Sequence, residues 1–230
     1  MRRLSAIMFT DMVGYSALAQ RNEALALELL DEHKELMRPF FGKHGGREIG
    51  TAGDSFFVEF TSAVEATECA IEIQNALYER NKTEPKERQI LIRIGLHIGD
   101  VVYTDDNVHG DGVNIAARME PLAKPGGICL SEDVARQIRN KIPYLVMKLG
   151  KGKLKNISLP VDIYSIVLPW QETHKKTKKG FPWKKLIPYA LSFLSIIILV
   201  GIFFFIRNKE ERGITHSKFR LAVLPLANIS

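Results

Sequence analysis

The sequence is poor in cysteine and opens without a secretory signal. Its 230 residues include only two cysteines, Cys69 and Cys129, too few and too far apart for a disulfide framework or a zinc site. We therefore expect both thiols to be reduced and packed in the interior. The apolar run after Arg2 and Arg3 is short and meets Asp11, which excludes a signal peptide in that stretch.

Outside a single segment, the sequence also has little excess of positive over negative charge. The formal net charge is +6, and residues 172–185 supply about five of these charges, with six lysines against one glutamate. The rest of the chain is close to neutral. A basic surface for nucleic acid is therefore not expected on the folded part, and we predict no nucleic-acid partner.

One long apolar run lies near the C-terminus. Residues 186–206 carry no charged side chain, and at about 1.5 Å per residue a helix of this length spans about 31 Å, the thickness of a bilayer core. A buried core helix is the alternative. The basic cluster before the run is denser than the mixed stretch after it. This predicts a single-pass protein of the cell inner (plasma) membrane with a cytoplasmic N-terminal domain.

These features divide the chain into four parts. We predict a folded domain over residues 1–168, a basic juxtamembrane linker over 169–185, a transmembrane helix over 186–206 and the start of an extracytoplasmic segment over 207–230. The final stretch, RLAVLPLANIS, looks like the first strand of a further domain. We therefore expect the chain to be incomplete at its C-terminus.

Hydrophobic periodicity over residues 1–168 predicts a mixed fold. The expected elements are a strand at 4–9, a helix at 22–44, a strand pair turning at 53–54, a helix from 63 to about 80, a strand pair at 90–103 turning at 99–100, a helix at 111–122, a strand at 128–130, a helix to about 140, and strands at 144–148 and 161–167. This order is typical of a ferredoxin-like βαββαβ sandwich of the α+β class. Helices would cover one face of its sheet and leave the other face, or one edge of it, available for a partner.

Two aspartates share a setting that suits a divalent cation. Asp11 follows an apolar strand and precedes Gly14 by three residues, and Asp54 lies beside Gly53 between two apolar strands. Asp11 could instead cap the following helix. Two carboxylates held within a few ångströms repel each other unless a cation lies between them. Two metal ions held in this way would suit phosphoryl transfer.

The segment HGDGVNIAARME supplies a third element. Asn114 and Arg118 are four residues apart, so they share one face of the predicted helix. An arginine there can stabilise a pentavalent phosphate, and an asparagine can orient a ribose. The alternative is a solvated arginine and an asparagine that simply occupies the first turn.

Together, FTDMVGYS, GDSFFVEF and GDGVNIAARME, followed by LKNISLPVDIYSI, resemble the class III adenylyl and guanylyl cyclase catalytic domain of the membrane-anchored bacterial type, over about residues 2–168. The resemblance implies a homodimer with shared active sites, in which one chain holds the metals and the other stabilises the transition state. It also implies the following roles: Asp11, Asp54 and the Met12 carbonyl on two Mg²⁺ or Mn²⁺ ions, the backbone of Val13, Gly14 and Tyr15 with Lys151 on the phosphates of ATP (or GTP), Asn114 on the ribose and Arg118 on the α-phosphate.

The chain departs from this family where the purine is read. Adenylyl cyclases usually have lysine four residues before the second metal aspartate, and guanylyl cyclases have glutamate; this chain has Gly50. Adenylyl cyclases usually have aspartate or threonine seven residues before the ribose asparagine; this chain has Asn107, which can face either purine. We expect Glu48, two residues before Gly50 on the same strand face, to lean into the gap.

The leading hypothesis is a membrane-anchored adenylate cyclase, a phosphorus–oxygen lyase that converts ATP to 3′,5′-cyclic AMP and pyrophosphate for intracellular signalling. A guanylyl cyclase and a catalytically silent module that dimerises and relays a signal are the alternatives. A membrane-tethered DNA-binding regulator is suggested only by the RLAVLPLANIS tail, and the lack of a basic face argues against it. The intact acid pair with Asn114 and Arg118 favours an enzyme.

Overall fold

A computed structural model describes residues 2–104, 107–152 and 161–174. The chain divides into two units, residues 1–174 and 175–230, and all described residues belong to the first. Across the described residues, no helix combines the length and apolar character that crossing a membrane requires. The predicted membrane helix at 186–206, most of the predicted linker and the C-terminal segment lie outside them.

The first unit alternates strands and helices in the mixed order that the sequence predicts. Its elements are β1 (Arg2–Met12), α1 (Tyr15–Arg21), α2 (Glu23–Lys43), β2 (Arg47–Ala52), β3 (Ser55–Phe60), α3 (Ala63–Asn81), η1 (Lys86–Arg88), β4 (Ile92–Thr104), β5 (Asn107–His109), α4 (Asp111–Met119), η2 (Glu120–Leu122), β6 (Gly127–Ser131), α5 (Glu132–Ile138), β7 (Leu145–Gly152), β8 (Val161–Val167) and η3 (Pro169–His174).

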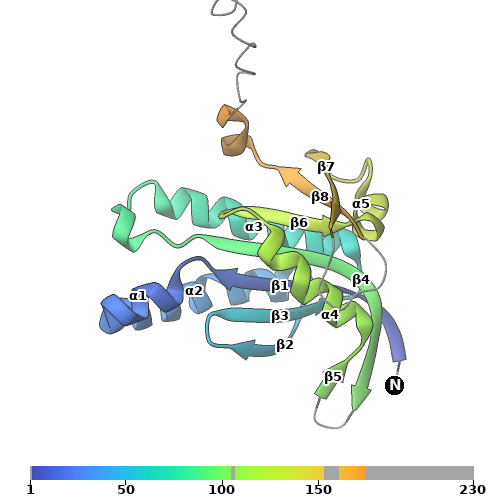
Figure 1. The fold of residues 1–230 in the computed structure, drawn as a ribbon, viewed down its shortest axis with the longest axis horizontal. Coiled ribbons are helices and arrows are strands. Elements are labelled where there is room, and N and C mark those ends of the chain that lie inside the picture. The colour runs from blue at the N-terminus through green and yellow to red at the C-terminus, as the bar shows by residue number, and fades with distance from the viewer. Residues whose placement is uncertain (1, 105–106, 153–160, 175–230) are drawn as a thin grey trace, which may run out of the picture. The chain divides into compact units, whose positions relative to one another are not determined.

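A single mixed sheet organises these elements (Figure 1). Its strand order is β2-β3-β1-β4-β6-β8-β7, and β5 pairs with β4 outside this path. β1 is central, because it pairs antiparallel with β3 on one side and with β4 along its whole length on the other. Only β4 and β6 run parallel among the described pairs. The chain therefore has the α+β architecture that its sequence predicts.

Helices α2, α3 and α5 cover one face of the sheet, which we call the helix face. Alternate strand residues point to this face and are fully buried with apolar residues of the helices, as the period of two along a strand requires. Those buried to 1% exposure or less include Met8, Phe56, Ile94, Leu96, Leu29, Met37 and Ile73. Cys69 and Cys129 are buried free thiols, which confirms their predicted packing.

The opposite face, which we call the site face, carries α4. In Figure 1 this helix lies in front of the strands while α2 and α3 lie behind them. Ala116 of α4 is buried with Ile7 of β1 and Val101 of β4. The prediction that helices occupy one face only was therefore incomplete, because one helix closes part of the other face.

Close packing of α4 explains a glycine that the sequence analysis misread. β4 is one continuous strand, so the predicted turn at Gly99-Asp100 is wrong. A Cβ atom at Gly99 would lie 2.5 Å from the Cα of Gly112, far inside van der Waals contact. The glycine is needed for the approach of the helix, and the chain reverses only after Thr104, into β5.

Candidate active site

The two predicted acids lie together at one end of the sheet. Asp11 stands one residue before the end of β1, which continues past the predicted end of that strand and pairs Asp11 with Arg93. Asp54 occupies the tight turn between β2 and β3 after Gly53, whose φ of 62° is left-handed. The Met12 N–H donates to Asp54 Oδ2 at 3.1 Å, and Ser55 Oγ donates to Asp11 Oδ1 at 3.0 Å. These bonds hold both carboxylates in one corner.

The electrostatics of this corner suit a cation. The pKa of Asp54 is raised above its ordinary value, first because burial disfavours the charged form and also because Asp11 repels a second negative charge. The guanidinium of Arg93 lies 3.9 Å from Asp11 Oδ2, at the limit of an ion pair. A divalent ion between the carboxylates would remove their repulsion, so the residues present fit such an ion.

No three His, Cys, Asp or Glu side chains in the described part of the chain converge as a complete metal site. An ion bound by Asp11 and Asp54 would therefore take its other ligands from the backbone, water or a nucleotide. A site with open coordination positions suits an ion that binds the phosphate oxygens of a substrate.

The turn after β1 only partly matches the predicted phosphate site. The Val13 N–H donates to the Leu91 carbonyl at 2.8 Å, because the β1–β4 pairing continues one residue past the strand. The prediction that this N–H faces phosphate is therefore wrong. Gly14 precedes α1 in the left-handed conformation, with φ 80° and no side-chain cap, so Gly14 and Tyr15 keep the predicted placement at a turn. The sequence analysis missed α1 itself.

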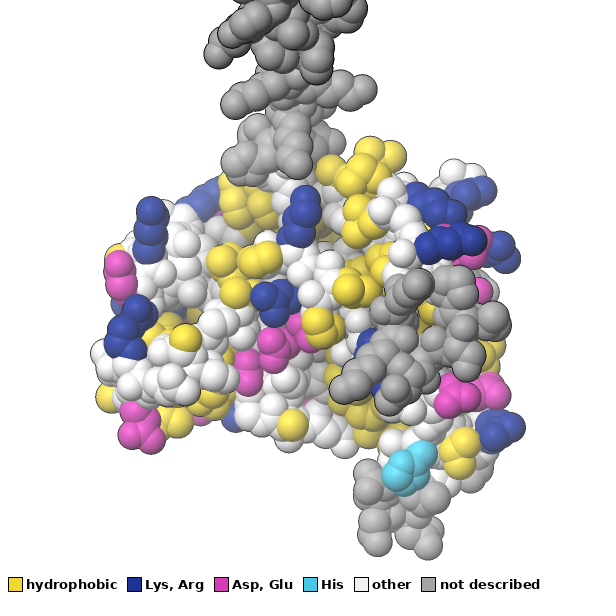
Figure 2. Space-filling view, in the orientation of Figure 1, with side chains coloured by type: hydrophobic (Ala, Val, Ile, Leu, Met, Phe, Trp, Pro, Cys, Tyr) yellow, Lys and Arg dark blue, Asp and Glu magenta, His cyan; other side chains and the backbone are white. Residues whose placement is uncertain are grey.

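Asn114 and Arg118 lie on α4, as predicted. The side chain of Asn114 is exposed and that of Arg118 is partly exposed. Neither side chain forms a hydrogen bond or an ion pair with any described residue of the chain, including Asp11 and Asp54. Figure 2 shows the site face, where acidic side chains gather near the middle beside basic ones.

Gly50 faces open space on the site face. It pairs with Phe57, whose ring stacks on Phe9 at 4.8 Å between centroids. A Cβ atom at Gly50 would meet no atom within 4 Å. The position that usually carries the purine-reading side chain therefore has no side chain and borders free space, with Phe57 as its neighbour on the next strand.

Glu48 does not fill this gap, contrary to the prediction. A bulge between Glu48 and Gly50 shifts the register, so Glu48 pairs with Val58, a residue of the helix-face core. Its carboxylate binds Arg38 of α2, with Nε 3.0 Å from Oε2. Two residues that share a face in a regular strand therefore point to opposite faces.

The two remaining predicted positions lie on later strands. Asn107 begins β5 opposite Thr104, and its side chain lies outside the described part of the chain. Lys151 lies on β7 opposite Asp162, with its side chain exposed.

Glu120 is a site residue that the sequence analysis missed. Its side chain is only 8% exposed, and its Oε1 is buried without a hydrogen-bond partner. Burial raises its pKa to about 7, and the negative charges of Asp11 and Asp54 add to the rise while Arg93 opposes it. Glu120 is therefore a third carboxyl group that interacts electrostatically with the acid pair, although the three do not converge as a metal site among the described residues. The only sequence signal was an acid at the end of an apolar helix.

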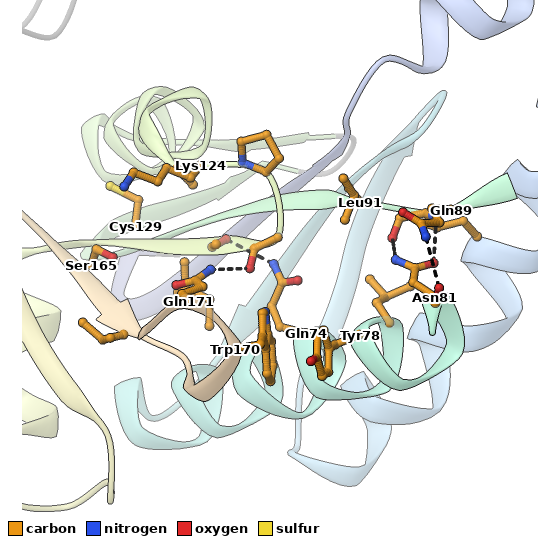
Figure 3. A pocket seen from close by; sticks show the side chains of 18 of the residues that line it. Gln74, Tyr78, Asn81, Gln89, Leu91, Lys124, Cys129, Ser165, Trp170 and Gln171 are labelled. Carbon is orange, nitrogen blue, oxygen red and sulfur yellow. Dashed lines mark hydrogen bonds between the residues drawn. The ribbon is translucent and has the colours of Figure 1, made fainter. Parts of the chain in front are cut away.

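A separate cavity of about 590 Å³ opens where α3, η3 and the start of β6 meet (Figure 3). Trp170 stacks on Tyr78 at 4.3 Å, and Gln171 Nε2 donates to the Gly126 carbonyl at 2.9 Å. Gln74 likewise donates to the Gly127 carbonyl at 3.1 Å. These amides bind backbone, and none of the predicted site residues lines the cavity.

Comparison with known proteins adds to this geometry. The family model described as the adenylate and guanylate cyclase catalytic domain matches residues 4–166. The chain is 41% identical over 165 residues to "Putative adenylate cyclase 3" of Rhizobium meliloti (strain 1021). The aligned region covers 71% of this chain and 28% of that protein. The chain thus spans little more than a quarter of this relative.

Two solved structures share the fold. The adenylate/guanylate cyclase/hydrolase from Silicibacter pomeroyi is 38% identical with a TM-score of 0.67, covering 73% of this chain and 98% of that one. The adenylyl cyclase CyaB from P. aeruginosa is 24% identical with a TM-score of 0.63, covering 73% and 95%, a likeness that bears on the fold alone.

Proposed function

Because the chain belongs to the adenylate and guanylate cyclase catalytic domain family, we propose that it converts ATP into 3′,5′-cyclic AMP and pyrophosphate. The observation that carries this proposal is the placement of Asp11 and Asp54 in one corner, each held by a hydrogen bond from the neighbouring strand. A catalytically silent module has little use for two carboxylates held against their mutual repulsion.

In this proposal Asp11, Asp54 and the Met12 carbonyl hold two Mg²⁺ or Mn²⁺ ions. Bound ions supply charge neutralisation on the triphosphate and favour loss of the proton from the 3′-hydroxyl. Gly14 and Tyr15 at the uncapped turn, with Lys151, bind the terminal phosphates. Arg93 adds a positive charge beside Asp11, where the same phosphates would lie.

The second half of the site comes from α4 of a partner copy. Asn114 orients the ribose, and Arg118 stabilises the α-phosphate as the 3′-oxygen attacks it and pyrophosphate leaves. The support is that both side chains are accessible and have no hydrogen bond or ion pair with the described residues of their own chain. A homodimer would bring the metal-binding half of each site from one chain together with α4 of the other chain, and would so contain two complete sites.

A specific observation favours one second candidate, a guanylyl cyclase. Gly50 offers no side chain to select adenine, and a Cβ atom at this position would meet no atom within 4 Å. A pocket that lacks a polar contact to the base discriminates weakly between purines. We also propose that residues 186–206 anchor the chain in the plasma membrane with the catalytic domain in the cytoplasm, because this run carries no charge and follows a lysine cluster.

The decisive experiment gives the purified chain Mn²⁺ with ATP or GTP and measures cyclic nucleotide by chromatography. Asp54→Ala should lower the rate by about a hundredfold or more. Asp31→Ala is the matched control, because Asp31 is an exposed aspartate of α2. Product from ATP that depends on Asp54 supports the proposal. No product from either nucleotide, in a folded dimer, would support the silent module.

Shared sites have their own test. A mixture of Asp54→Ala and Arg118→Ala chains forms heterodimers with one complete site, built from the acids of one chain and the Arg118 of the other. We expect activity to return on mixing two inactive proteins. Failure to recover any activity in a verified heterodimer would show that each chain builds its own site.

A further inference from the structure

Glu120 occupies a place where two parts of the molecule meet. It is the first residue of η2 and follows α4 directly. A Cβ atom at Gly95 would lie 2.3 Å from the Glu120 backbone nitrogen, so the backbone of Glu120 rests directly on β4. Its carboxyl group is nine-tenths buried, and Oε1 has no hydrogen-bond partner in the described structure. A buried, unpartnered carboxyl oxygen is costly and calls for a reason.

The backbone of Glu120 lies over the part of β4 that pairs with the end of β1 carrying Asp11. Gly95 lies two residues from Arg93 on β4, so both face the same side of the sheet. Arg93 in turn pairs with Asp11 across the β1–β4 ladder. Asp11 and Asp54 both act electrostatically on Glu120, and Arg93 opposes them. Any change of charge in the acid corner therefore changes the force on Glu120.

The backbone of the segment from α4 to η2 has no break in its helical conformation between Met119 and Glu120 at which the segment could bend. Met119 and Glu120 both have right-handed helical backbone angles, so η2 continues the helix. Gly112 packs on Gly99 at the other end of α4, while Ala116 and Met119 are fully buried between these points. A body packed at native density moves as a unit. A shift of Glu120 is therefore passed to Asn114 and Arg118.

Resting on the shared dimer of the proposed function, we propose that Glu120 is a positioning residue that couples the two active sites. Its carboxyl group responds to the charge of the acid corner of its own chain, and the rigid α4–η2 segment passes that response to Asn114 and Arg118, which serve the other site. When a cation neutralises Asp11 and Asp54, the repulsion on Glu120 is relieved, and α4 takes the pose that the second site needs.

A heterodimer of the unsubstituted chain and an Arg118→Ala chain, isolated through two affinity tags, tests the coupling. Its working site takes acids from the Arg118→Ala chain and Arg118 from the unsubstituted chain. The silent site keeps its acids and can still bind metal and nucleotide. Adding Glu120→Gln to the chain that supplies Arg118 removes a carboxyl group near the acids of the silent site and leaves the acids of the working site unchanged; Glu120 is joined to the working site through Arg118, two residues before it on the α4–η2 segment. Any effect on the working site must then pass through α4.

With that placement we expect kcat to fall about five- to tenfold while KM stays unchanged, because Arg118 acts mainly in the transition state. The matched control is Glu132→Gln in the same chain, since Glu132 lies on α5 of the helix face. An unchanged kcat would overturn the coupling, even if Glu120→Gln in the other chain lowered activity. That result would assign Glu120 a local role only.

A second measurement does not depend on activity. In full-length chain labelled at methionine methyl groups, adding Mg²⁺ should shift the resonance of Met119, which is fully buried beside Glu120, and leave Met37 of α2 unmoved. Glu120→Gln should abolish the Met119 shift. A shift that persists in the variant, or its absence from the parental protein, would overturn the proposal. Lack of product in the unsubstituted homodimer would instead contradict the proposed function, and the Met119 resonance would still decide the coupling.

Discussion

Replacing Glu120 by glutamine should make the metal-free protein more stable above neutral pH. Burial and two neighbouring carboxylates raise the pKa of Glu120 from 4.5 to about 7. Because the folded pKa lies above the unfolded one, the protein keeps its full stability below about pH 4.5 and loses stability as the pH rises through about 7. A shift of about 2.5 units at about 1.4 kcal/mol each predicts a loss of about 3 kcal/mol.

Glutamine has the same shape and cannot ionise, so the variant should not show this loss. Urea unfolding in EDTA, at one fixed protein concentration, gives the free energy of unfolding of both proteins at pH 5 and pH 8. We expect the two proteins to differ little at pH 5, and the variant to be more stable by about 3 kcal/mol at pH 8. A difference that does not change with pH, or a less stable variant at pH 8, would refute the reasoning. All other titrating groups are common to both proteins.

Three further predictions concern other residues. Gly95→Ala should lower stability by about 1–3 kcal/mol, because its Cβ would lie 2.3 Å from the Glu120 backbone nitrogen, whereas Gly50→Ala meets no atom within 4 Å and should change the melting temperature little. Gly50→Lys with Asn107→Asp should raise the preference for ATP over GTP by about tenfold, measured as the ratio of kcat/KM values; an unchanged ratio would mean that other residues read the purine. Glu59→Gln should destabilise the fold by about 3–5 kcal/mol in thermal unfolding at pH 7, because Glu59 is buried and bonded to Arg3 and Arg47. Burial alone would raise the pKa of Glu59, but hydrogen bonds from Arg3, Ser5, Tyr103 and Arg47 outweigh it and hold the pKa at about 2. The advantage of glutamate should therefore disappear as the pH falls from about 4.5 toward 2.

The elements that follow hydrophobic periodicity could be predicted from the sequence. Asn22 caps α2 through a bond from the Leu25 N–H, and Ser62 caps α3 at the predicted position. The turn that holds Asp54 also lies where the glycine and its apolar flanks place it. These features are local, because a cap or a tight turn is determined by residues a few positions apart.

The features that the sequence analysis missed depend on contacts between distant segments. A glycine in a strand pattern indicates a turn, a bulge or a close approach, and only the position of Gly112 shows that Gly99 serves an approach. The bulge that turns Glu48 away from Gly50 depends on pairing with β3. Glu120 looks like an ordinary helix-end acid until the fold brings it near Asp11.

These errors have a common cause, which lies in the difference between the two faces of the sheet. The helix face is closed by apolar contacts, so alternating hydrophobic residues describe it well. The site face differs because its features are close backbone contacts and charged groups. Gly95 and Gly99 have no side chains, which lets α4 pack on the sheet, and Gly50 borders free space. Glu120 has a buried Oε1 with no hydrogen-bond partner in the described residues. Gly95 and Gly99 stabilise the single chain because they let α4 pack on the sheet, but the open space at Gly50 and the unpartnered carboxyl oxygen of Glu120 do not. In the proposed function, cations, a nucleotide and a second copy complete this part of the face, so an analysis of the hydrophobic core of one chain does not describe the site.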